Sequence, residues 1–485
     1  MFFRSIVWWY ATNIVLQRKR AIRFAPLVML ACATANAAIP PQRQDLDREF
    51  QAAVAQYDAG HYREAAAQLE KLLPSVPKSF EVRELLGLVY SAESQDAKAT
   101  AHLSEAVRLK PDSAAARTNL AANLSRLGKF SLAEEQFKKA AELEPETFDT
   151  NHNLGEAYVR SAKIPEAVPF LEKAQRINPF SYDNGYDLSL AYIQTGRLVD
   201  ARAQLHDLLK RKETAELHNL LAEVEEKDGR FVDAANEFEL AAHMEPSESN
   251  LFDWGSELLI HRTLQPAIDI FQQATARYPN SSRLAIGLGM ALYSLGKYDD
   301  AVKSLLKAAD LNPADPRCYP FLARAYDSSP SQADEVIERF RRFSELQPRN
   351  AQALYYYAMS LWKGKRAQDP GMDLHQIETL LKKSIDLEPK LADAHLQLGN
   401  LHSDQNKYAE AIPEYLRAIK LNSDLADAHY RLAQAYVRTG QKELAQPQFE
   451  VYQKLRAEHL ADLDKQKADI RQFVYSEKEG LAAKQ

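Results

Sequence analysis

The chain has 485 residues, of which 46% are hydrophobic and 26% charged, and these proportions are typical of a soluble folded protein rather than a disordered one. Its formal net charge of -6 argues against binding to nucleic acid through a general basic surface. A single compact core would be unusual at this length, whereas a repeat architecture grows by adding neighbours and escapes that limit.

Residues 1–37 have the composition of a targeting segment. They contain five basic residues and no acidic one: Arg4, Arg18, Lys19, Arg20 and Arg23. An apolar run over residues 24–33 and the sequence Ala35-Asn36-Ala37 follow. These features are typical of a secretory signal peptide, so we expect cleavage after Ala37 and export to the periplasm or out of the cell.

Cleavage after Ala37 would change the charge and the cysteine content. The 61 basic residues would fall to 56 against 67 acidic ones, which gives a formal net charge of -11. Cys318 would be the one cysteine left of two, so no intrachain disulfide could form and the fold would depend on packing alone.

Three alternatives for the amino-terminal segment stay open. Residues 2–16 are also largely apolar and make the leader longer than the usual ~15 to 30 residues, which a later translation start, for example at Val15, would explain. An uncleaved membrane anchor is the second, although neither apolar stretch clearly reaches the ~20 residues of a spanning helix. The third is a lipid on Cys32, which follows Met29-Leu30-Ala31.

From about Leu46 a unit of about 34 residues recurs along most of the chain. The best copy has these residues on two predicted helices and at their ends: Leu120, Ala121, Leu124, Gly128, Phe130, Ala133, Phe137, Ala140 and Pro145. The next copy has the same pattern: Leu154, Gly155, Tyr158, Ile164, Ala167, Leu171, Ala174 and Pro179. The spacing places the apolar residues on one face of each helix, with a turn at the glycine and a stop at the proline.

This pattern resembles the tetratricopeptide repeat (TPR). The resemblance implies an all-α fold, a right-handed α-solenoid of about twelve stacked helix-turn-helix repeats with a capping helix at the carboxyl end. A single helix pair cannot bury its apolar face, so each repeat needs neighbours. No strand-like alternation is long enough to compete with the helical period.

The register predicts the following organisation. After the leader, residues 38–45 form a short linker, and residues 46–326 hold repeats 1 to 8 and the first part of repeat 9. Residues 327–389 hold irregular repeats with an insertion. The last repeats occupy residues 390–459, and the capping helix and tail occupy residues 460–485. The fifth repeat lacks a closing proline, which predicts a longer second helix there.

Catalytic signals are nearly absent from the sequence. None of the twelve histidines stands in a His-Glu-x-x-His pattern or beside further metal ligands at a suitable spacing. His395 and His429 occupy the same place one repeat apart, and we expect them to be partly buried or to face the groove without a metal. Gly287-x-Gly289 has no preceding strand, so it indicates packing rather than a phosphate loop. We therefore expect a non-enzymatic protein without a cofactor or metal.

The TPR resemblance implies that ligands bind in a concave groove lined by the first helix of each repeat. Candidate partner-binding residues are the first-helix side chains that packing does not use: His152, Asn153, Tyr186, Phe252, Tyr355, Tyr356, Met359, Trp362, Asn400, Tyr430, Arg431 and Gln434. Tyr355, Tyr356, Tyr357 and Trp362 cannot all enter one helix interface, so we expect one or two to be exposed as partner anchors. The alternative is that these rings fill gaps in an irregular repeat.

One binding mode of the family can be tested on the residues. Co-chaperone TPRs hold a terminal carboxylate with lysine, arginine and asparagine side chains. Asn119 matches the middle asparagine, but the neighbouring repeats offer Glu84, Leu88, Asp149 and Asn153 instead of the cations. An acidic peptide terminus is therefore a poor ligand for this stretch.

These observations predict a protein–protein interaction scaffold of the cell envelope that binds peptides or helices of partner proteins in its groove. The partners are proteins and not nucleic acid, with membrane association possible through the amino terminus. One alternative is a structural component of an envelope secretion or polysaccharide-export assembly. The other is an enzyme with an unrecognised site.

Overall fold

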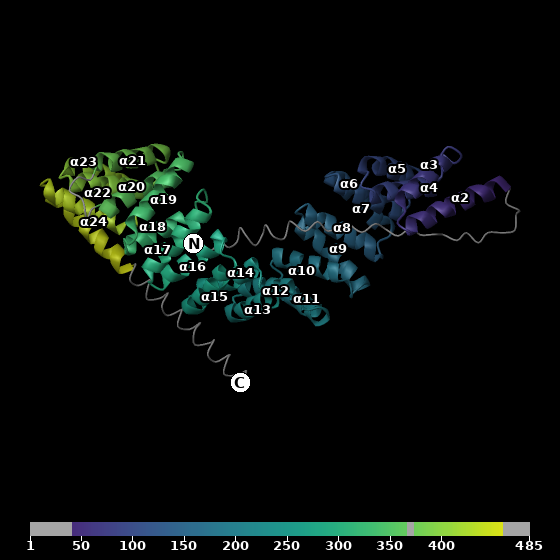
Figure 1. Ribbon diagram of the computed structural model, residues 1–485, viewed down its shortest axis with the longest axis horizontal. Helices are drawn as coiled ribbons and strands as arrows, with labels where there is room; N and C mark the ends of the chain where they lie inside the picture. Colours follow the sequence, from purple (N-terminus) through teal and green to yellow (C-terminus); the bar gives the residue numbers. More distant parts are fainter. Residues whose placement is uncertain (1–40, 366–372, 459–485) are drawn as a thin grey trace, which may run out of the picture. The chain divides into compact units, whose positions relative to one another are not determined.

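The computed structural model describes residues 41–365 and 373–458, and every regular element in these ranges is an α-helix (Figure 1). The all-α prediction is confirmed. The leader, most of the insertion and the predicted capping helix over 460–485 lie outside the described residues. None of the helices in the described ranges has the length and apolar character needed to cross a membrane.

The described residues form two compact bodies, which divide between Asp228 and Gly229. We call residues 41–228 the first body and residues 229–458 the second. The first body contains α2 (Pro41–Asp58), α3 (Tyr62–Leu72), α4 (Phe80–Ala92), α5 (Asp96–Leu109), α6 (Ala114–Arg126), α7 (Phe130–Leu143), α8 (Phe148–Arg160), α9 (Ile164–Ile177), α10 (Tyr182–Gln194), α11 (Leu198–Arg211) and α12 (Ala215–Lys227).

The second body continues the alternation of helices. It contains α13 (Phe231–Met244), α14 (Glu248–Ile260), α15 (Leu264–Arg277), α16 (Ser282–Ser294), α17 (Tyr298–Leu311), α18 (Tyr319–Ser328), α19 (Ala333–Leu346), α20 (Ala351–Lys365), α21 (Leu374–Leu387), α22 (Ala392–Asp404), α23 (Tyr408–Leu421), α24 (Ala426–Arg438) and a last helical stretch over 442–458. Along the sequence the described helices alternate as twelve first and twelve second helices, the number that the register predicts.

The first helices of the repeats form an inner layer in each body. In the first body α4 contacts α6 and α6 contacts α8, while in the second α14 contacts α16 and α16 contacts α18. Most inner helices also pack on the second helix of their own repeat, as α8 does on α9 and α16 on α17. Stacked pairs of this kind rotate from one to the next, so the inner helices line the concave side of each body.

The ends of the helices follow from local chemistry. Several inner helices begin after a serine whose hydroxyl accepts a hydrogen bond from a backbone N–H three residues on, as Ser113 does from Ala116. The turn to the second helix needs one residue in the left-handed region, which glycine adopts without strain, as at Gly128 with φ 72°. Ala162 adopts φ 57° at the same place, so the turn is kept even where glycine is missing.

The predicted longer helix in the fifth repeat is wrong. The second helix there, α11, has 14 residues, as do α9 and α15, whose repeats carry the proline. Lys212 adopts an extended conformation that ends α11, and α12 already begins at Ala215. The shortened turn therefore replaces the proline as the stop signal.

The Gly287-x-Gly289 sequence is a packing feature, as predicted. A Cβ atom on Gly287 would lie 2.5 Å from the Phe271 ring, and one on Gly289 would lie 2.5 Å from Cγ of Leu305. The phenyl ring also lies against Gly255 on α14, where a Cβ would be 3.0 Å away. Glycine therefore allows α14 and α16 to approach the side chains of α15 and α17.

His395 and His429 have the same role in their repeats. The Nδ1 atom of His395 lies 2.7 Å from Glu414, and its Nε2 lies 3.4 Å from the carbonyl oxygen of Pro389. His429 repeats this geometry with Gln448 at 2.7 Å and the carbonyl of Ser423 at 3.1 Å. Both rings are buried and connect the two helices of their own repeat to the preceding turn.

Candidate binding surface

Hydrogen bonds between successive inner helices identify the side chains that face the concave side of the first body. The Nδ2 atom of Asn119 on α6 lies 3.5 Å from Oε1 of Glu84 on α4. The hydroxyl of Tyr186 on α10 donates to Glu216 on α12 at 2.6 Å. We call the surface formed by such residues of α4, α6, α8, α10 and α12 the inner face of the first body.

Two predicted residues of α8 lie on this face in different environments. His152 is 4% exposed, stacks on Phe148 with ring centroids 5.2 Å apart, and has Nδ1 3.1 Å from Oδ1 of Asn184. Asn153 is 1% exposed, yet neither its amide nitrogen nor its oxygen has a hydrogen-bond partner among the described residues. His152 is therefore part of the packing, and Asn153 has free hydrogen-bonding capacity.

Thr118 on α6 has unused capacity of the same kind. It is 1% exposed, and its hydroxyl has no hydrogen-bond partner in the described part of the chain. Sequence reasoning missed Thr118, although the register signals it, since it occupies in α6 the place that His152 occupies in α8. Unpaired buried polar groups cost about 1–3 kcal/mol each. Because these atoms have almost no exposed surface, a bound segment recovers part of this free energy where the neighbouring side chains move aside.

Glu84 is a carboxylate of this face whose acidity is strongly perturbed. Burial raises its pKa from 4.5 to about 7, while the hydrogen bond from Asn119 and the charge of Lys110 act in the opposite direction. The nearby charge of Glu81 adds to the rise. Near neutral pH this group is therefore poised between its neutral and charged forms.

Phe252 and Asp253 lie on α14 in the second body. Phe252 packs edge-on against Phe271 at 6.1 Å, and the guanidinium of Arg283 lies 4.3 Å from its ring centroid. Burial raises the pKa of Asp253 to about 6, with the positive charge of Arg283 opposing the shift. The predicted residue Phe252 therefore lies between its own core and a charged side chain.

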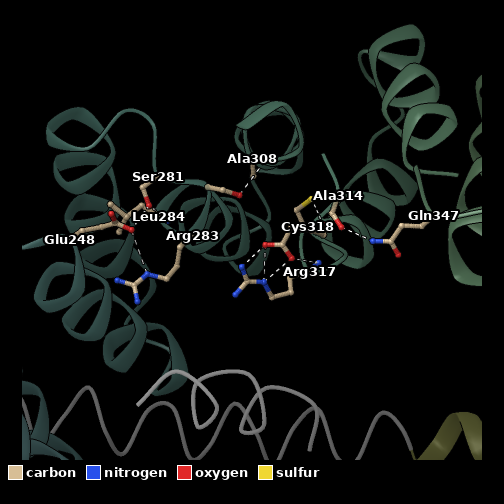
Figure 2. A network of polar contacts seen from close by, with 11 residues as sticks. Glu248, Ser281, Arg283, Leu284, Ala308, Ala314, Arg317, Cys318 and Gln347 are labelled. Carbon is tan, nitrogen blue, oxygen red and sulfur yellow. Dashed lines mark hydrogen bonds and ion pairs between the residues drawn. The ribbon is translucent and has the colours of Figure 1, made fainter. Parts of the chain in front are cut away.

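A network of polar contacts around Arg283 holds the inner helices α14 and α16 together (Figure 2). Arg283 Nε lies 3.7 Å from Glu248 Oε1, and the same oxygen accepts a hydrogen bond from Ser281 at 2.7 Å. Farther along the chain the Gln347 amide donates to the carbonyl of Ala314 at 2.6 Å. These contacts join neighbouring repeats, and each of these groups is already paired.

The aromatic group of α20 contributes mainly to the interior. Trp362 is 5% exposed and belongs to the hydrophobic cluster around Leu381 and Leu398, against which Met359 also packs. Tyr355 and Tyr356 are partly buried, and their ring centroids lie 5.6 Å apart in an edge-on arrangement. The structure therefore favours the alternative in which these rings fill the irregular repeat.

The last four predicted residues lie on α22 and α24. Asn400 accepts a hydrogen bond from Tyr415 at 3.0 Å and donates one to Gln397 at 3.1 Å. Tyr430 packs against Phe449 and Tyr452, at 5.9 Å and 5.0 Å between ring centroids.

The other two residues on α24 differ in exposure. Arg431 is exposed and Gln434 is half-buried. The structure therefore distributes the twelve predicted residues over both bodies, and on the inner face of the first body it brings together His152, Asn153 and Tyr186.

Models of a known repeat family match most of the described chain. Models described as "Tetratricopeptide repeat" match residues 50–114, 118–182, 158–224, 258–325 and 426–459, and one described as "TPR repeat" matches residues 399–440. These segments coincide with consecutive helix pairs of both bodies.

The curated relatives are long proteins that the chain matches in part. Human protein O-mannosyl-transferase TMTC3 is 26% identical over 226 residues, which are 46% of this chain and 24% of that protein. Human protein O-mannosyl-transferase TMTC1 is 22% identical over 160 residues, which are 33% of this chain and 18% of that protein. The chain thus spans about a quarter or less of the length of these relatives.

Several solved structures are similar at low identity. Yeast Tom70 is 17% identical with a TM-score of 0.36, covering 91% of this chain and 99% of that one. YrrB, described as a TPR protein with an unusual peptide-binding site, is 16% identical with a TM-score of 0.36, covering 38% of this chain and 94% of that one. Values of this size identify no partner for the chain.

Proposed function

The chain belongs to the tetratricopeptide repeat family, and we propose that it is a non-catalytic scaffold that binds peptide segments of partner proteins on the inner face of the first body. The observation that carries the proposal is the unpaired carboxamide of Asn153, with the unpaired hydroxyl of Thr118 one repeat earlier. A carboxamide offers both a donor and an acceptor, and a peptide backbone offers the same pair in return.

The non-enzymatic part of the proposal has a structural basis. Helix pairs and short turns account for the described residues, 41–365 and 373–458. The mannosyl transfer named for the relatives belongs to proteins that are about four times longer than the aligned stretch. The residues of this chain that match family models match TPR repeats.

The experiment pairs a binding measurement with a stability measurement. Peptides selected from a display library on the chain beginning at Ala38 are titrated against a variant with Thr118→Val and Asn153→Leu. We expect affinity to fall about tenfold or more, since each lost hydrogen bond is worth about 0.5–1.5 kcal/mol. The midpoint of thermal unfolding should not fall, because removing an unpaired buried polar group is neutral or stabilising.

The control is a variant with Thr275→Val and Gln446→Leu, similar changes on helices away from the inner face. It should bind the selected peptides as the wild type does. A library that yields no binding peptide, or peptides that bind the Thr118→Val, Asn153→Leu variant with unchanged affinity, would refute the proposal.

The proposed place of action is the cell envelope, on the basis of the signal-like composition of residues 1–37. We expect a carboxyl-terminally tagged chain to appear in the envelope fraction with Ala38 as its first residue. Recovery of the full-length chain from the cytosol would refute this placement. Isolation in a large complex of fixed stoichiometry would favour the alternative of a structural assembly component.

A further inference from the structure

A phenylalanine projects from the turn between α9 and α10 in the first body. Phe180 is 80% exposed, more than any other large hydrophobic side chain of the described residues. It follows Pro179, the proline that closes its repeat. The residue after the closing proline is polar or small in the other repeats that have one: Lys78, Asp112, Glu146, Ser247, Asn280, Ala314, Arg349 and Lys390. The stack therefore does not require an apolar side chain at this position.

Four basic side chains surround the exposed ring at the ends of two second helices. Arg176 stands in the last turn of α9, and Lys210 and Arg211 stand in the last turn of α11. Lys212 directly follows α11. Arg176 and Lys210 occupy the same register position in neighbouring repeats, and both α9 and α11 pack on α10 (Figure 1). The cations of the two helices therefore lie at the same end of the first body.

Direct contacts join the end of α11 to the turn that carries the ring. The guanidinium group of Arg211 lies 5.0 Å from the ring centroid of Phe180, and it donates a hydrogen bond to the carbonyl oxygen of Pro179. The ammonium group of Lys212 lies 5.6 Å from the ring centroid of Tyr182. Ile177, the last residue of α9, is 39% exposed beside this turn. We call the following residues the Phe180 patch: Arg176, Ile177, Phe180, Lys210, Arg211 and Lys212.

Most of the positive charge of the Phe180 patch is not paired. Arg211 forms an ion pair with Asp207. Arg176, Lys210 and Lys212 are exposed, and none of them has an ion pair with another residue that the structure describes. Basic residues in the last turn of a helix also complement the helix dipole, which accounts for Arg176 and Lys210 in part. The dipole does not account for Lys212, which lies beyond the helix, or for the exposed ring.

The other carboxylates close in sequence do not cancel this charge. Glu213 lies next to Lys212, but its Oε1 atom is 3.2 Å from Nε2 of His218. Asp183 lies on the inner helix α10, where it is half-buried. With Asp207 these are three carboxylates against the four cations of the patch. The patch is therefore an apolar tip with a cationic surround.

The shape of the Phe180 patch fits a membrane surface better than a folded partner. A stable protein–protein interface buries about 800 Å² on each side and places its anchor residues in well-packed pockets. A ring that is 80% exposed on a turn has no pocket around it. An apolar side chain on such a turn can enter the headgroup layer without shape complementarity, while lysine and arginine beside it attract anionic headgroups.

We propose that the Phe180 patch docks the first body on a membrane surface that contains anionic lipids. Phe180 and Ile177 would enter the interfacial layer, and the four cations would lie at the level of the headgroups. The docking is peripheral, and it uses neither the inner face nor residues 1–37. It therefore goes beyond the proposed binding of peptides and does not depend on it.

The test is sedimentation of the chain beginning at Ala38 with lipid vesicles. This chain keeps every described residue and lacks residues 1–37, whose basic and apolar side chains could themselves bind a membrane. One set of vesicles is phosphatidylcholine alone, and the other contains about 30% phosphatidylglycerol. We expect binding to the anionic vesicles at about 0.05 M salt, weaker binding at about 0.5 M, and no binding to the neutral vesicles.

Two matched substitutions test the exposed ring. Phe180→Ser removes the apolar tip, and Val199→Ser removes another strongly exposed apolar side chain, 73% exposed, at the opposite end of α11. Phe180→Ser should weaken vesicle binding about tenfold, since an apolar side chain of this size loses its transfer out of water. Val199→Ser should weaken it less than about twofold.

Two matched double variants test the cations. The patch variant carries Arg176→Gln and Lys210→Gln, and the control carries Lys71→Gln and Lys129→Gln, which are exposed lysines of the same body without an ion pair to any described residue. Each cation at an anionic surface contributes about fivefold, so the patch variant should lose about tenfold or more and the control less than about twofold. All these side chains are exposed, so the midpoint of thermal unfolding should stay unchanged.

The outcomes separate this inference from the proposed peptide binding. Equal binding to neutral and anionic vesicles, no binding to the anionic ones at low salt, or equal losses in the patch and control variants would overturn it. An oligoglutamate peptide that binds the patch when anionic vesicles do not would assign the patch to an acidic protein and also overturn it. The patch variant should bind the library peptides as the wild type does, so neither result decides the other.

Discussion

Replacement of Phe271 by alanine should destabilise the second body strongly. The ring is fully buried, and glycines on two neighbouring inner helices, Gly255 and Gly287, lie against it. A Phe→Ala change in a core costs about 3–5 kcal/mol, depending on how far the site can collapse. Because a glycine has no side chain that could move into the cavity, we expect a value in the upper part of this range.

A second substitution, Gly287→Ala, tests the contact between Gly287 and Phe271. Its effect on the free energy of unfolding should have opposite signs in the presence and in the absence of the Phe271 ring. In the wild type the new methyl group would lie 2.5 Å from the Phe271 ring, and overpacking of this kind costs about 1–3 kcal/mol. Alanine gains about 1 kcal/mol of helix propensity, so the net effect is a destabilisation of about 0–2 kcal/mol. In the Phe271→Ala background the clash is absent, and the same change should stabilise by about 1 kcal/mol.

The assay is urea unfolding of the chain beginning at Ala38, followed by tryptophan fluorescence and by circular dichroism. Trp254 and Trp362 are then the tryptophans that remain, and both lie in the second body. As a control, Phe137→Ala empties an equally buried site of the first body, and it should move the circular dichroism transition while leaving the fluorescence transition in place. A loss below about 1 kcal/mol for Phe271→Ala, or the same sign for Gly287→Ala in both backgrounds, would refute the packing argument.

Two further predictions concern titratable groups. Since the pKa of Glu84 is about 7 in the folded chain and 4.5 is its ordinary value, the folded state holds an extra proton between these values, and stability should fall as pH rises from about 5 to about 7. Glu84→Gln should remove up to about 3 kcal/mol of this dependence in unfolding measured across that range, and an unchanged pH profile would contradict it. Burial raises the pKa of the Cys318 thiol to about 12, so a thiol reagent should label it at the rate at which the second body opens. Fast labelling at neutral pH without denaturant would show that the thiol is accessible in the folded state.

Much of the fold could be predicted from the sequence because each repeat imposes the same constraints on its neighbours. Gly155 is required where a Cβ would lie 2.6 Å from Leu171, and this kind of contact returns in other repeats. The end of α11 was less accessible to prediction, because Lys212 stops the helix through its extended backbone and no proline marks the place. The division into two bodies between Asp228 and Gly229 could not be predicted either, because the 34-residue pattern of the sequence continues across this point without a break.

The candidate site was predictable in its location and less so in its chemistry. The register placed His152 and Asn153 together on an inner helix, but it could not show that one ring is stacked and paired while the adjacent carboxamide has no partner. Trp362 shows the opposite case, because a large ring in a first helix can fill a gap in the stack as well as meet a ligand. Pairing and burial depend on neighbouring helices, which a single repeat does not encode.

Comparison of equivalent positions explains why a binding surface of this kind is hard to see in any one repeat. The same inner-face position holds Glu84, Thr118, His152 and Tyr186 in four successive repeats, four different chemistries with no common requirement from packing. The partner is the other constraint on such a position, and an extended partner contacts several repeats at once. A binding surface of this kind therefore becomes visible only along the stack, where equivalent positions of successive repeats line one side of the body.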